Sequence, residues 1–146
     1  MFTLVRGKTK FMWLPVTIST AITINKLVAW NTSAGTLIEA TATTAGNIMI
    51  GVLRHAIATT DDDYATARTV EVEVPVEKYV EWKADVGTGT PSATADLGIY
   101  HDIDDGGNID VDASDYDIFF ATRYVDATHM IGILNIGPES LGVAGD

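Results

Sequence analysis

The sequence predicts an all-β protein, a compact β-sandwich or β-barrel of about ten short strands with an extended N-terminal arm. Apolar residues recur at every second position in several segments, which is the period of half-buried strands. Residues that favour turns separate those segments. The composition, 47% hydrophobic and 20% charged, is that of a chain that folds, and 146 residues suffice for one core or two very small lobes.

Residues 1–15 form the first element, which mixes apolar and basic side chains. The first acid is Glu39, so residues 1–38 carry a formal charge of +4 and the remainder −15. The segment is either the first strand of the domain's own sheet or an arm that adds to a neighbour's sheet edge and meets an acidic partner. The candidate residues for contacts with a partner or another subunit are Phe2, Leu4, Arg6, Lys8, Lys10, Phe11 and Trp13.

The β domain is expected over residues 16–136, and its alternation is clearest in two segments. In Val16–Ile24 most apolar side chains share one face, and Pro15 in front suits the start of a strand. In Thr69–Val76 four valines alternate with Thr, Glu and Pro, and Val80–Ala84 continues the alternation. The other expected strands are Leu27–Trp30, Thr36–Ala40, Ile48–Ile57, Leu97–His101, Asn108–Asp112, Ile118–Val125 and Met130–Ile136.

The segments between these strands have turn chemistry. Asn, Asp, Gly, Ser, Thr and Pro cluster at 31–35, 59–63, 87–91 and 104–108. A short helix is an alternative at Asp61–Arg68 or Pro91–Asp96, and neither would change the fold class. Residues 137–146 have the small residues of a flexible C-terminal tail.

A weak internal similarity suggests two lobes, 16–84 and 92–136. In each half an aromatic residue, Trp30 or Tyr100, precedes a polar turn with Gly and a strand. A Met-Ile-Gly segment follows in both halves, at Met49–Leu53 and Met130–Leu134, but the spacings differ. The similarity is either a duplication or two similar hairpins that arise from common β rules.

No pattern in the sequence predicts catalysis or a cofactor. His55, His101 and His129 lie far apart, and each is expected to be a surface or locally bonded residue of a strand. The chain has no cysteine and none of the short motifs of hydrolases, zinc proteases, phosphate loops or dinucleotide sites. We therefore expect a protein that is not an enzyme and that binds no cofactor.

The acid-rich segment 101–112 is the best candidate for an ion site. Asp102, Asp104, Asn108 and Asp110 fall at positions 1, 3, 7 and 9 of a calcium loop. Position 12, where such a loop needs a bidentate Glu, is Ala113, and strands rather than helices flank the segment. A tight Asp/Gly hairpin with solvated acids is the favoured interpretation, so no metal site is predicted.

Other acids are interpreted as solvated. Glu71 and Glu73 project from one face of a strand, where the spacing of a glycosidase pair is conceivable but no cleft is indicated. Asp61-Asp62-Asp63 is expected to be a loop. A net charge of −11 disfavours nucleic-acid binding, and no apolar stretch approaches a membrane span. The polar and basic residues of Met1–Trp13 do not fit a secretion signal.

The layout resembles the small decoration (cement) proteins of tailed-bacteriophage capsids. The similarity rests on Leu27–Trp30, Asn47–Leu53, Val74–Val76 leading to Glu81–Asp85, and Ala93–Tyr100 with Asp110–Ala113. The resemblance implies a β body on the outer capsid surface of the virion, bound to the major capsid protein and commonly trimeric, with a terminus that clamps its neighbours.

Two alternatives to a capsid component remain open. One is a subunit of a phage tail, a fibre or an extracellular filament, which assembles by strand exchange through the N-terminal segment. The other is a secreted carbohydrate-binding module, which would need aromatic residues grouped with acids. Trp13, Trp30 and Trp82 show no such grouping in the sequence.

Overall fold

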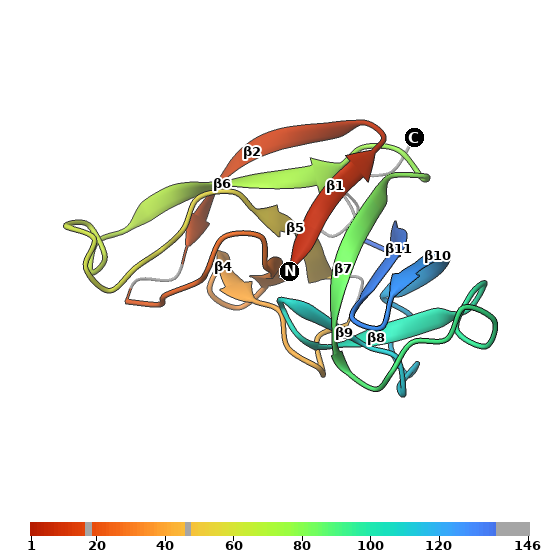
Figure 1. Cartoon of the computed structure of the whole chain (residues 1–146). Helices are drawn as coiled ribbons and strands as arrows, with labels where there is room; N and C mark the ends of the chain where they lie inside the picture. The colour runs from red at the N-terminus through yellow and green to blue at the C-terminus, as the bar shows by residue number, and fades with distance from the viewer. Residues whose placement is uncertain (17–18, 46–47, 137–146) are drawn as a thin grey trace.

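The chain folds into two closed five-stranded rings that lie side by side (Figure 1). The computed structural model describes residues 1–16, 19–45 and 48–136, so the predicted tail 137–146 lies outside the described residues. The first ring consists of β2 (Thr9–Val16), β3 (Leu27–Asn31), β4 (Thr36–Glu39), β5 (Met49–Leu53) and β6 (Arg68–Pro75). The second consists of β7 (Glu81–Thr88), β8 (Tyr100–Asp105), β9 (Asn108–Asp110), β10 (Phe119–Asp126) and β11 (His129–Leu134), with β1 (Phe2–Arg6) added at β7. The predicted all-β class is confirmed.

The two rings repeat one topology. In each ring the first strand in chain order runs parallel to the third and antiparallel to the fifth. The second strand pairs antiparallel with both the third and the fourth. The fourth and fifth strands pair antiparallel and complete the ring. The same five-stranded unit therefore occurs twice in this chain.

This repeat agrees only in part with the similarity seen in the sequence. Trp30 and Tyr100 lie in β3 and β8, which are the second strands of their rings. Met49–Leu53, however, is β5, a fourth strand, whereas Met130–Leu134 lies in β11, a fifth strand. The predicted lobe boundary between 84 and 92 is also wrong, because β7 opens the second ring at Glu81.

Two apolar clusters form the core, and one of them joins the rings. The first cluster fills the first ring. The second, which we call the joint cluster, fills the second ring and includes residues of β3 and β5. On β3, Val28 points into the first ring while Leu27 and Ala29 belong to the joint cluster. Both faces of this strand are thus buried, which explains its unbroken apolar run.

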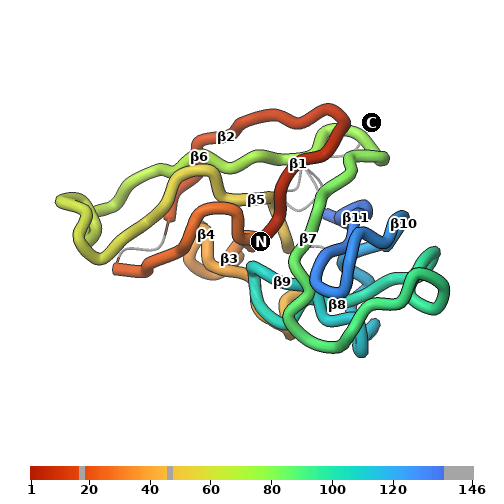
Figure 2. Tube along the Cα trace, in the orientation of Figure 1, coloured from red at the N-terminus to blue at the C-terminus, as the bar shows by residue number. Residues whose placement is uncertain are grey.

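The N-terminal segment belongs to the body, so the predicted extended arm is wrong and the alternative of a first strand holds. β1 pairs with residues Glu81–Ala84 of β7, and β9 pairs with the following part of the same edge. Figure 2 shows the N-terminus beside β9 and β1 running along β7 away from it. β2 pairs with β6 along its whole length, because Thr9–Val16 lies opposite Arg68–Pro75.

The predicted strand Val16–Ile24 is wrong, and neither of the two short helices that were left as alternatives forms. Val16 ends β2, Pro15 lies inside that strand, and of the described residues in 19–24 only Ile22 forms a bridge, to Ile57. Ser19 has a φ of 56°, which an extended strand does not allow. Asp61–Arg68 and Pro91–Asp96 form turns and no helix up to the start of β6.

Candidate interaction surface

The outer face of β2 exposes two aromatic side chains. Phe11 and Trp13 are 55% and 59% exposed, whereas Leu14 and Val16 are buried in the first ring. The alternation of a strand places Phe11 and Trp13 on the face that points away from the ring interior. The ring of His55 lies 6.4 Å from that of Trp13, centroid to centroid. We call Phe11, Trp13 and His55 the aromatic surface.

A buried ion pair supports this surface from β6. Glu73 lies opposite Phe11 in the ladder. Its carboxylate accepts hydrogen bonds from Arg54 Nε at 2.5 Å and from Thr9 Oγ1 at 2.7 Å. The side chains of Glu73 and Arg54 are 5% and 17% exposed. The prediction that Glu73 lies on a solvated face is therefore wrong, because Arg54 and Thr9 cover it.

The other residues predicted for partner contacts separate into two groups. Phe2 is fully buried and packs edge-on against Phe119, and Leu4 packs against the joint cluster. Lys8 and Lys10 are exposed, and Arg6 forms an ion pair with Glu81 at 2.7 Å. The structure thus brings only part of the predicted set to the surface, and it places Phe11 and Trp13 together there.

The acid-rich segment forms the tight hairpin that was the favoured interpretation. β8 and β9 flank a two-residue turn, Gly106-Gly107. The expectation that the acids of this segment are solvated is wrong for Asp102, which is buried and whose carboxylate accepts hydrogen bonds from the backbone N–H groups of Asp115, Tyr116 and Asp117.

The remaining predicted ion ligands have partners of other kinds. Asp104 accepts a hydrogen bond from Thr88 Oγ1, Asn108 donates to Asp105, and Asp110 accepts from the backbone N–H of Asp112. In the described part of the chain, no three histidine or acidic side chains gather in a way that could hold a metal ion. The four residues lie in β8 and β9, and each has a hydrogen-bond partner within the chain.

The three histidines lie in separate places. His101 is buried, and its Nε2 is 2.9 Å from the carbonyl oxygen of Asp96. The Nδ1 atom of His129 is 2.8 Å from Asp126 Oδ1, across the turn between β10 and β11. Local partners for His101 and His129 agree with the prediction. The sequence did not predict the contact of His55 with Trp13, because the two residues are 42 positions apart and no local pattern links them.

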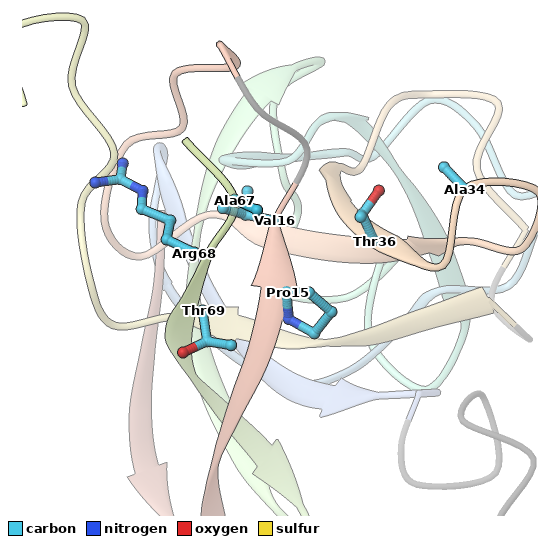
Figure 3. A pocket seen from close by; sticks show the side chains of 7 residues that line it. All are labelled: Pro15, Val16, Ala34, Thr36, Ala67, Arg68 and Thr69. Carbon is cyan, nitrogen blue, oxygen red and sulfur yellow. The ribbon is translucent and has the colours of Figure 1, made fainter. Parts of the chain in front are cut away.

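A shallow hollow lies at the seam between β2 and β4 (Figure 3). Its one charged side chain is Arg68, whose guanidinium is held by Asp61 and Asp63. The backbone N–H of Ala58 and then Arg68 keep the pKa of Asp61 below its usual value. The lining consists of Pro15, Val16, Ala34, Thr36, Ala67, Arg68 and Thr69, which offers no nucleophile paired with a base.

Comparisons with family models, with curated proteins and with solved structures find no match to this chain. Among the described residues, no helix is long and apolar enough to cross a membrane. The arrangement offers rigid surfaces for binding, and the exposed pair Phe11 and Trp13 is the most conspicuous of them.

Proposed function

We propose that this chain is a structural decoration (cement) protein of a viral capsid. The observation that carries the proposal is the aromatic surface on β2, where two large apolar side chains are held exposed by a rigid closed ring. Aromatic residues of this kind are the usual anchors of protein interfaces. The partner in this proposal is the major capsid protein on the outer surface of the virion.

The architecture supports a binding role that requires no conformational change. Closed rings leave few free strand edges, so the body resists pairing edge to edge with its neighbours. A net charge of −11 favours the solubility of the free protein. Contact area across the seams between capsid subunits is all that such a protein has to supply.

The alternative of a filament built by strand exchange has less support. β1 and β2 have partners within the chain, and β2 uses all eight of its residues in the pairing with β6. A carbohydrate-binding module would need further exposed tryptophans, whereas Trp82 is fully buried and Trp30 packs against the first core. Neither observation favours these alternatives over a capsid component.

The test is binding to purified heads of the virus that encodes the chain, stripped of their own decoration. We expect the wild-type protein to sediment with the heads, and the variant F11S/W13S to lose at least about tenfold in affinity. The matched control T3S/T69S changes two exposed polar residues of β1 and of β6 and should bind as the wild type does. The proposal would be contradicted if the heads did not bind the wild-type protein, or if they bound the wild type and F11S/W13S with equal affinity.

A further inference from the structure

The outer face of the second ring carries three cations from three strands. Arg6 of β1 lies opposite Glu81 of β7, Arg123 of β10 lies opposite Ile131 of β11, and Ile131 lies opposite Lys83. Residues directly opposite each other in a ladder share a face. Because Trp82 and Ala84 point into the joint cluster, Lys83 points outward. We call Arg6, Lys83 and Arg123 the basic face.

The charge of this face is opposite to that of the molecule. Glu81 is the one acid between these cations, and its side chain is 8% exposed. It pairs with Arg6 at 2.7 Å and with Arg123 at 3.4 Å, whose side chains are 74% and 55% exposed. Three cations and one carboxylate give a formal charge of +2, which leaves −13 for the rest of the chain.

The acids nearest to the basic face in the same sheet have partners of their own. Asp85 and Asp126 lie farther along β7 and β10, and both contact His129. The basic face therefore keeps guanidinium and ammonium donors that a partner's carboxylates can reach.

An apolar strip adjoins the basic face. Phe120 lies opposite Tyr100 on one side and Ile133 on the other, and Ile133 lies opposite Glu81. The rings of Tyr100 and Phe120 meet edge to face, with 5.1 Å between their centroids. Arginine and tyrosine beside half-buried apolar residues are typical of the surfaces that bind proteins.

We propose that the basic face docks on a second copy of this chain, on the acidic remainder of its surface outside the basic face, which we call the acidic surface. The charges are complementary, because this face carries +2 and the rest of the chain carries −13. Because the two contacting surfaces differ, the contact is heterologous, and copies join head to tail. The basic face lies on the second ring and its sheet partner β1, whereas Phe11 and Trp13 lie on β2 of the first ring. Variants of the basic face therefore test this contact separately from the proposed function.

The first test is the oligomeric state of the purified protein by light scattering at about 50 mM and about 500 mM salt. We expect association at low salt that weakens by at least about tenfold at high salt, because salt screens exposed charges. K83E should weaken association to a similar extent at low salt and leaves the Arg6–Glu81 pair intact. K10E makes the same change of charge at an exposed lysine of the first ring and should have little effect.

The proposal would be overturned by a monomer at low salt, by association of equal strength at low and high salt, or by equal effects of K83E and K10E on association. The head-to-tail geometry has its own test. The variant K83E/R123Q loses its basic face but keeps its acidic surface, so it should still capture wild-type protein while failing to associate with itself. Failure to capture wild-type protein would exclude the heterologous contact.

Discussion

Glu71 and Glu73 are two residues apart on β6 and share a face, yet their environments differ. Glu71 is half-buried, whereas Glu73 is buried between Arg54 and Thr9. Alternation along the strand predicts the shared face correctly. It cannot predict what covers one of the two residues, because Arg54 and Thr9 come from other segments of the chain.

Loss of the charge on Glu73 should therefore destabilise the fold. In E73Q the guanidinium of Arg54, 17% exposed, keeps its charge and its hydrogen bond to Asn25 but loses the carboxylate that neutralises it. We expect the free energy of unfolding to fall by about 2 to 3 kcal/mol, as measured by urea denaturation. E71Q is the matched control and should cost less than about 0.5 kcal/mol. Equal costs would show that the Arg54–Glu73 pair contributes little.

Asp126 should titrate far below the usual range of a carboxyl group. The backbone N–H of Thr128, followed by His129 and the Thr128 hydroxyl, lowers its pKa to about 2. Since the folded state has the lower pKa, the stabilisation from this turn is fully present above about pH 4 and is lost as the pH falls through about 2. NMR titration of the carboxyl carbon should show this midpoint, and T128A should raise it. A midpoint near 3.8 in the wild type would contradict this assignment.

At the scale of elements, the alternation of apolar and polar residues predicts a strand well where one face of the strand is exposed to solvent. Thr69–Val76 matches β6 to within one residue at each end. The alternation fails as a predictor where apolar residues are buried without belonging to a strand. In Val16–Ile24, for example, Ile22 is buried although it lies in a loop. The alternation also missed most of β8, since Asp is rare in strands. There the backbone N–H groups that bind Asp102 offset the cost of burying a carboxylate.

A substitution of Gly51 tests how closely β5 and β6 are packed. A Cβ at this position would overlap the backbone carbonyl of Glu73. Strand propensity alone predicts that G51V is favourable, whereas the structure predicts a loss of at least about 2 kcal/mol. Thermal unfolding measures the difference. G98A is the control, because Gly98 has a φ of 74° but open space around it, so only about 1 kcal/mol of backbone strain is expected. A stabilised G51V would refute the close packing.

At the scale of the whole molecule, the repeated ring was visible in the sequence only as an unresolved possibility. The two Met-Ile-Gly segments that suggested it lie in strands that are not equivalent, β5 and β11. Pairing between strands far apart in the chain defines the repeat, and such pairing leaves no trace in local composition. The proposed contacts likewise depend on residues that only the fold brings together, such as Arg6 and Arg123.

The joint cluster predicts that both rings unfold as one unit. Leu27 and Met49 of the first ring and Trp82 and Phe119 of the second belong to the same cluster. In the variant W13F/W30F, Trp82 is the single tryptophan and reports on this cluster. Its fluorescence and the far-UV circular dichroism should change together, with one midpoint in urea. Two separate midpoints would mean that the rings are independent.

The position of β1 has a consequence for what happens when the chain is cut. The chain passes between the rings twice, once from β1 to β2 and once from β6 to β7. Cleavage at 76–80 would leave an N-terminal fragment that still holds β1, and β7 of the other fragment is its partner. The N-terminal fragment would therefore hold the whole first ring together with the one strand that the second sheet lacks, so the two fragments are built to complement each other at β1 and β7.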